Sequence, residues 1–288
     1  MIRQCALVLL GIVGFSASGF SQILPQNTLH LQDCLECESL TTMTEKDFNQ
    51  LIDKAEAVYS PIIKAHGAYL NFNRLWSDST VNASAYQSGN DWEVNMYGGL
   101  ARRPEVTDDG FTLVICHELG HHLAGFPYSS WAANEGQSDF FATHKCAPTL
   151  WKNEVAVNAK ARETVDPEPK KECDAIYKTE DAQDLCYRIA MAGKSLANLL
   201  GALQDRAPDW KTPDTSVVRR TDNRHPKAQC RLDTYMAGAV CLSEFDPSVI
   251  PGNGNSLKDE EDSSQHHCTK SRQFDVGLRP TCWFKPRL

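Results

Sequence analysis

The chain has 288 residues, and its 37 acidic against 29 basic side chains give a formal net charge of −8. Such an acidic balance argues against nucleic acid as a partner and offers no attraction to an anionic membrane. The length suits one domain with a substantial core, or one domain with a small appendage.

The first residues are typical of a secretory signal peptide. Arg3 precedes an apolar run over residues 6–15, and small residues follow, so cleavage is expected after Gly19 or Ser21. The run is too short to span a membrane, and no later segment approaches the roughly twenty apolar residues that would. We therefore expect residues 1–21 to be a signal peptide and the mature protein to be soluble, secreted or periplasmic, with no integral membrane segment.

The cysteines agree with export. Of the 11 cysteines, Cys5 would leave with the signal peptide, and the remaining even set is enough for up to five disulfides. The connectivity cannot be deduced, and the most local pairs are Cys34 with Cys37 and Cys173 with Cys186. The first of these pairs could be redox-active or bind metal. However, no second pair at zinc-finger spacing and no thioredoxin-like context accompanies it, which favours a structural disulfide.

The region before the central motif predicts one helix and a set of strands. Residues 44–66 have a Thr44 cap and Asp47 in the first turn, and they predict a helix that is kinked or divided at Pro61. Residues 68–100 are rich in strand formers, and the Gly-Asn pair at 89–90 is a hairpin signal.

The central motif is H-E-x-x-H, from His117 to His121, inside an expected helix over residues 108–125. Thr107 supplies a cap for this helix. Because positions i and i+4 lie on one helix face, His117 and His121 can converge on one metal ion. Glu118 would sit beside that metal without binding it and take a proton from a water that the metal activates. The alternative is a helix with two packed or solvated histidines.

A catalytic zinc needs a third protein ligand. Glu135 and Asp139 share one face of an expected helix over residues 135–146. Glu135 could complete the site, and Asp139 could accept the free N–H of a ligand imidazole, which would fix the tautomer of that ring. His144 competes with Glu135 for the third position. The alternative is a solvated acidic face at a helix start.

The remaining elements follow from composition and periodicity. Residues 164–171 predict a loop, and residues 180–204 predict a long amphipathic helix. A further helix is expected over residues 226–242. The polar residues 251–267 predict a mobile loop, in which the pair His266-His267 would be solvated.

Together the motifs resemble a known group of enzymes. H-E-x-x-H followed by the E-x-x-x-D of residues 135–139 is similar to the gluzincin metallopeptidases. Residues 81–86 and 92–100, in this order before the zinc helix, resemble the HtpX-like and CAAX-prenyl-protease-like peptidases. The resemblance covers residues 81–144. The chain departs from these relatives in its short step from His121 to the third ligand and in lacking membrane segments.

The resemblance implies two further roles. Residues 81–87 would form the edge strand that pairs with an extended peptide substrate, although an ordinary structural hairpin is the alternative. His225 would face the active site and hydrogen-bond the developing oxyanion, with Arg224 as an alternative donor. The simpler interpretation of this His-Pro pair is a helix start at Pro226.

These observations predict an α+β protein: a mostly helical, disulfide-stapled, zincin-like metallopeptidase domain over residues 22–250 with a small antiparallel sheet. Residues 251–288 would form a flexible loop and a disulfide-tethered tail. The expected function is hydrolysis of protein or peptide substrates with one Zn²⁺ per chain. His117, His121 and Glu135 would be the ligands and Glu118 the general base. The alternatives are an inactive zinc-site protein in binding or envelope assembly, and a metal-dependent amidase of cell-wall substrates.

Overall fold

The computed structural model describes residues 19–31, 43–204 and 206–287. The apolar run of the expected signal peptide and the expected pair Cys34–Cys37 lie outside these residues. In chain order the elements are β1 (Ser21–Gln22), α1 (Glu45–Ala65), β2 (Tyr69–Leu75), β3 (Ala83–Ser88), β4 (Asp91–Tyr97), α2 (Gly98–Ala101), α3 (Asp108–Leu123), β5 (Tyr128–Ser129), β6 (Ala132–Ala133), α4 (Glu135–Phe141), the π-helix η2 (Ala142–Cys146), α5 (Ala147–Trp151), α6 (Val155–Asn158), α7 (Ala161–Thr164), α8 (Pro167–Ile176), α9 (Glu180–Leu203), α10 (Ala228–Ala239), α11 (Leu257–Gln265) and the 3-10 helix η3 (Lys270–Arg272).

The larger sheet has four strands in the order β1-β3-β4-β2. The predicted hairpin is confirmed, since β3 and β4 pair antiparallel on either side of residues 89–90. β2 pairs parallel with β4, so the prediction of an antiparallel sheet is wrong for this strand. The reason is that β4 lies between β2 and β3 in the sheet. The chain reverses its direction from β2 to β3 and again from β3 to β4, so β4 runs in the same direction as β2.

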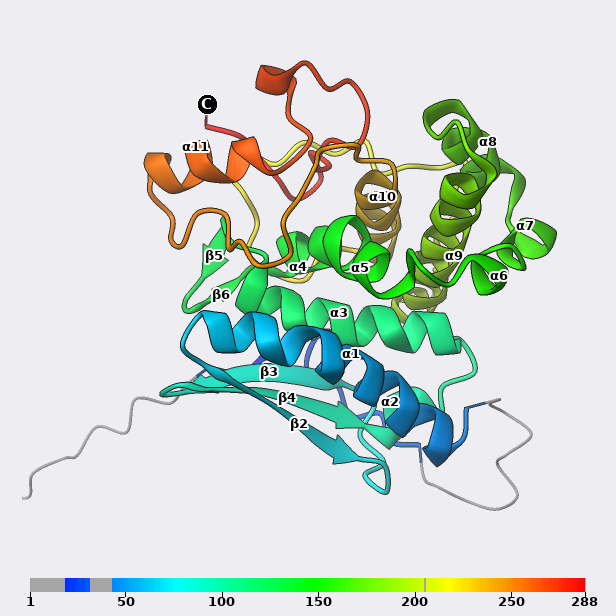
Figure 1. Cartoon of the computed structure of the whole chain (residues 1–288), viewed down its shortest axis with the longest axis vertical. Coiled ribbons are helices and arrows are strands. Elements are labelled where there is room, and N and C mark those ends of the chain that lie inside the picture. The colour runs from blue at the N-terminus through cyan, green and yellow to red at the C-terminus, as the bar shows by residue number, and fades with distance from the viewer. Residues whose placement is uncertain (1–18, 32–42, 205, 288) are drawn as a thin grey trace, which may run out of the picture.

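Helices cover one face of this sheet in successive layers (Figure 1). α1 packs on β2 and on α3, α3 also contacts β3, α9 packs on α3 away from the sheet, and α10 packs on α9 and α4. Every residue of α3 from Gly110 to Leu123 is buried as a result. A helix surrounded on all sides needs apolar residues all round, which explains why its sequence shows no single apolar stripe.

The expected α1, α3 and α9 are present with boundaries close to those predicted. Thr44 caps α1 in a capping box with Asp47, and the helix continues across Pro61, so it is not divided there. Thr107 caps α3 by accepting a hydrogen bond from the Gly110 N–H. These agreements follow from local signals that fix where a helix begins.

Two predicted loops are partly wrong because they contain short polar helices. α8 begins at Pro167, within the expected loop 164–171, where proline suits the first helical turn. α11 lies within the expected loop 251–267 and starts with a capping box between Ser256 and Asp259. His267 is not solvated but is 1% exposed, with its Nε2 3.0 Å from the Gln137 side chain.

The C-terminal tail packs on the site-bearing helices. Trp283 is fully buried, and a Cβ atom on Gly136 of α4 would lie 2.3 Å from the Trp283 ring. The Trp283 indole N–H donates to the Thr234 hydroxyl of α10. The tail therefore helps to hold α4 against α10, beyond the tethering that was expected of it.

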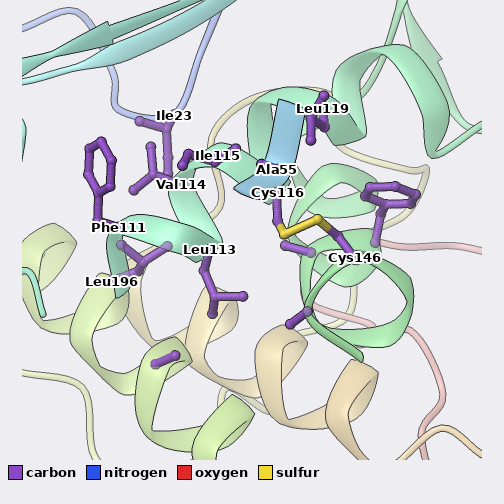
Figure 2. Packing of buried hydrophobic residues seen from close by; sticks show 14 of the residues in the cluster. Ile23, Ala55, Phe111, Leu113, Val114, Ile115, Cys116, Leu119, Cys146 and Leu196 are labelled. Atoms are coloured by element: carbon purple, nitrogen blue, oxygen red, sulfur yellow. A yellow bond between two sulfur atoms is a disulfide. The ribbon is translucent and has the colours of Figure 1, made fainter. Parts of the chain in front are cut away.

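Four disulfides lie in the part of the chain that the structure describes. They are Cys116–Cys146, Cys173–Cys186, Cys230–Cys282 and Cys241–Cys268. One of the two most local possibilities, Cys173–Cys186, is present, and Cys116–Cys146 ties α3 to η2 (Figure 2). Such a density of disulfides is typical of proteins from oxidising compartments outside the cytoplasm. Separately, no helix within the described ranges is long and apolar enough to cross a bilayer.

η2 also carries a buried lysine. Lys145 is fully buried, and its Nζ has no hydrogen-bond partner among the described residues. Burial lowers the pKa of Lys145 from 10.5 to about 8, against the opposing charges of Asp246 and Asp262. Below pH 8 the Lys145 ammonium is charged in both the folded and the unfolded protein. Its burial then lowers the free energy of unfolding by the whole desolvation cost. The cost disappears as the pH rises from about 8 to 10.5, because only the unfolded state then holds the proton.

We expect Lys145→Met to raise the free energy of unfolding at pH 7 by about 3 kcal/mol, since the pKa difference is worth about 1.4 kcal/mol per unit. The difference in the free energy of unfolding between the variant and the parent should decrease from pH 8 to 10.5, because the folded parent then releases the Lys145 proton and its desolvation cost disappears. Denaturant titrations of both proteins across this pH range would measure it. Lys171→Met, at an exposed position of α8, is the control and should show no such pH dependence. An equal or lower stability of Lys145→Met at pH 7 would contradict the expectation.

Candidate metal centre

His117 and His121 lie one helical turn apart on α3, with their ring centroids 4.7 Å apart. The Nδ1 atom of His117 is 2.8 Å from Asp139 Oδ1, and that of His121 is 2.8 Å from the Ala133 carbonyl oxygen. Because both partners are acceptors, each ring is set to carry its proton on Nδ1. The Nε2 atom of each ring then keeps a free lone pair, as a metal ligand requires.

Glu135 comes to the two histidines through a short return of the chain. Gly125, with φ at +75°, ends α3, and the two-stranded sheet of β5 and β6 leads to α4, whose first residue is Glu135. Gly120 lets the two helices approach closely, since a Cβ atom there would lie 2.9 Å from the Ser138 Cα. The step from His121 to Glu135, short as it is, therefore suffices to bring the carboxylate to the histidines.

The three side chains converge on one point. Glu135 Oε2 lies 3.3 Å from His117 Nε2, and Glu135 Oε1 lies 3.7 Å from His121 Nε2. Ligand atoms bound tetrahedrally at about 2.0–2.1 Å from a zinc ion are about 3.3 Å apart. One ligand atom from each residue lies within 4.8 Å of the other two.

Unsatisfied polar atoms support a cation at this point. The Nε2 atoms of His117 and His121 and Oε2 of Glu135 are buried and have no hydrogen-bond partner among the residues that the structure describes. Burying such atoms unpaired is costly, and a metal ion would satisfy all three together. Burial by itself would lower the pKa of His117, but Asp139 and Glu135 raise it to about 9. The same negative charges would favour a bound cation, and His117, His121 and Glu135 together could hold a metal ion.

Glu118 lies beside this group and is fully buried. Its carboxylate oxygens have no side-chain hydrogen-bond partner among the described residues, and the backbone N–H of Ile23 lies close enough to lower the pKa of Glu118. Burial, helped by the charge of Glu135, raises its pKa to about 8, while His117 and Arg231 act in the opposite direction. A carboxylate with such a pKa can hold or release a proton near neutral pH.

Asp139 anchors a buried network behind His117. Its Oδ1 accepts hydrogen bonds from the Arg231 guanidinium and from the Tyr235 hydroxyl, both on α10. Asp139 and Arg231 are both 0% exposed. Burial would raise the pKa of Asp139, but the charges of Arg231 and His117 hold it below its usual value. The carboxylate therefore stays ionised and fixes the orientation of the His117 ring.

Sequence reasoning missed Arg231 and Tyr235. They occupy positions i and i+4 of the helix that was expected over residues 226–242, so one face of it carries both. An arginine within a helix that also has buried leucine and methionine residues was the available signal, but its partner Asp139 lies 92 residues away.

The other candidates have different surroundings. His225 is partly buried, with its Nε2 3.5 Å from Glu135 Oε2 and 2.7 Å from the Gln22 carbonyl oxygen. Arg224 pairs with Asp222, and its side chain is 87% exposed. His144 lies outside the group, with its Nε2 3.1 Å from the Ser243 carbonyl oxygen. The structure thus brings His225 near the candidate ligands, but neither Arg224 nor His144.

Comparison of the chain with protein-family models, curated proteins and solved structures returned no match. The likeness to gluzincin peptidases accordingly rests on the motifs alone. What the chain does has to be argued from the geometry of this site.

Proposed function

We propose that the chain is a zinc-dependent peptidase of gluzincin type, with one Zn²⁺ bound by His117, His121 and Glu135. The observation that carries the proposal is the convergence of three buried ligand atoms, without hydrogen-bond partners in the described part of the chain, beside the buried carboxylate of Glu118. Two imidazoles and one carboxylate are the protein donor set of a catalytic zinc site, whose fourth position is taken by water or substrate. A site that only stabilised the fold would gain nothing from a buried carboxylate next to it.

In this proposal, zinc would polarise the scissile carbonyl and make a water molecule more acidic. Glu118 takes a proton from that water on one of its free oxygens and then delivers it to the leaving amine. His225, near Glu135, donates a hydrogen bond to the oxygen that becomes negative. Asp139 and Arg231 keep the His117 ring in place, and β3 aligns an extended peptide beside the helix.

The proposed setting is secretion or the periplasm. The four disulfides support an oxidising compartment, and the amino-terminal pattern supports export by a signal peptide. An exported peptidase would act on protein or peptide substrates.

Metal removal tests the proposal. The purified protein should contain about one zinc per chain, in keeping with a single three-ligand site. Dialysis against a chelator should remove the zinc and abolish hydrolysis of an unfolded, alkylated protein, and added zinc should restore both. Zinc content and peptide release measured on the same samples provide the check. Hydrolysis that persists after complete metal loss would contradict the proposal, and cleavage of cell-wall amides in place of peptides would favour the amidase alternative.

A further inference from the structure

The substrate-binding edge of the proposed peptidase is already paired with part of the same chain. β1 runs antiparallel to β3, with Ser21 opposite Ala85 and Gln22 opposite Ser84. The pairing continues beyond β1, since the Ile23 N–H donates to the Ala83 carbonyl oxygen at 3.3 Å and the Leu24 N–H to Asn82 Oδ1 at 3.1 Å. β3 overlaps residues 81–87, the range on which an extended peptide was expected to add.

Three successive residues of this segment touch residues of the metal centre. The Ser21 hydroxyl lies 3.2 Å from Glu135 Oε1 and 3.1 Å from His121 Nδ1. The carbonyl oxygen of Gln22 accepts a hydrogen bond from His225.

The third residue of the segment, Ile23, is held by the network behind the site. Its carbonyl oxygen accepts a hydrogen bond from Arg231, the guanidinium that also binds Asp139. The segment is therefore bound by side chains that also contact or orient the candidate ligands, as well as by backbone pairing.

Burial divides the segment into an anchor and a tip. Ile23 and Leu24 are 1% and 0% exposed, and Figure 2 shows Ile23 among the α3 side chains Val114 and Ile115. Phe20 is 63% exposed, and its ring lies against Tyr86 with centroids 4.9 Å apart. Ile23 and Leu24, the anchor, are thus part of the core. In the tip, Ser21 and Gln22, which reach the metal centre, are only partly buried, and Phe20 is mostly exposed.

We propose that residues 20–22, which stay in the mature chain when the signal peptide is cleaved after Gly19, are a tethered, substrate-like strand that keeps the metal centre latent until it leaves β3. This inference rests on the proposed function and deepens it. The incoming ligand is an extended peptide that runs antiparallel to β3 with one side chain in the place of Ser21. Residues 20–22 compete with this free peptide for pairing with β3. Because Ile23 and Leu24 tether them, they compete at a high effective concentration, although they form only a two-residue ladder.

Two substitutions shift this competition in opposite directions. Ile23 and Ala83 form a hydrogen-bonded pair, so Gln22 and Ser84 form the closer, non-hydrogen-bonded pair. The double variant Gln22→Cys with Ser84→Cys should therefore form a disulfide that locks the strand on β3. Ser21→Pro instead removes the N–H that faces β3 and the hydroxyl that faces Glu135, and it should release the tip.

The test measures binding in zinc-loaded proteins that begin at Phe20 and also carry Glu118→Gln, so that no cleavage occurs. The probe is a fluorescein-labelled peptide with the sequence of residues 20–24, followed by anisotropy. We expect the oxidised lock to bind at least about tenfold more weakly than the parent, and the released variant at least about tenfold more tightly. Each single cysteine variant, which cannot form the lock, is the matched control and should bind like the parent.

Equal binding of the probe to the locked and parent proteins, or no binding to any variant, would overturn the inference and leave β1 as an ordinary sheet strand. Should Ser21→Pro fail to fold, the lock and its single-cysteine controls decide by themselves. Hydrolysis by the same variants with Glu118 restored separates the two proposals. If none hydrolyses a peptide while the binding order holds, the peptidase proposal falls and the competition by the strand stands.

Discussion

Glu118→Gln is expected to lower peptide hydrolysis by about 10²–10⁴-fold, the usual contribution of a general base. The substitution keeps the size of the side chain but removes the carboxylate that would accept the proton. Because glutamine fills the same buried volume and keeps one carbonyl oxygen as an acceptor, the packing around position 118 should be retained. The measurement is kcat/KM for an unfolded protein or peptide, together with zinc content and thermal stability.

The zinc content of Glu118→Gln should equal that of the parent, because Glu118 is not among the three converging residues. Glu163→Gln, at an exposed position in α7, is the matched control and should retain activity. Undiminished hydrolysis by zinc-loaded Glu118→Gln would end the proposed mechanism while leaving the metal site intact.

The second large effect is expected at Asp139. Asp139→Asn leaves the Arg231 guanidinium buried without its counter-charge, and breaking a buried pair in this way costs about 3–5 kcal/mol. It also weakens the contact that orients His117, so zinc affinity should fall by about 10–100-fold. Denaturant unfolding and competition with a metal indicator would measure the two losses.

A second substitution separates the two effects of Asp139→Asn. Adding Arg231→Met removes the unpaired charge, so the double variant should recover much of the stability but none of the zinc affinity. Asp181→Asn, exposed in the first turn of α9, controls for the loss of a carboxylate elsewhere. Recovery of zinc affinity together with stability would show that Asp139 acts only through the fold.

The helices that could be predicted are those with strong local signals. α1 and α3 have threonine caps followed by acidic residues, and α9 has a long apolar period. α8 and α11 escaped prediction because their sequences are polar, and only the proline and the capping box at their first residues marked them. The parallel pairing of β2 with β4 was missed for a different reason, since strand order depends on which strand lies between the other two.

The sequence by itself determined the core of the candidate site. The spacing of His117 and His121 is set by helix geometry, and so is the spacing of Glu135 and Asp139, so each pair shares a helix face wherever the helix packs. The even cysteine set likewise indicated disulfides without telling which cysteines pair.

Only the tertiary structure decided what surrounds these residues. Arg231 meets Asp139 across 92 residues and the Ile23 carbonyl across 208, and Ser21 meets Glu135 across 114. No periodic pattern in the sequence predicts such contacts, because they depend on how the helices and the sheet pack together. The N-terminal strand on β3 is the clearest case: nothing in residues 19–24 marks them as a partner of the metal centre, and only the completed sheet brings them there.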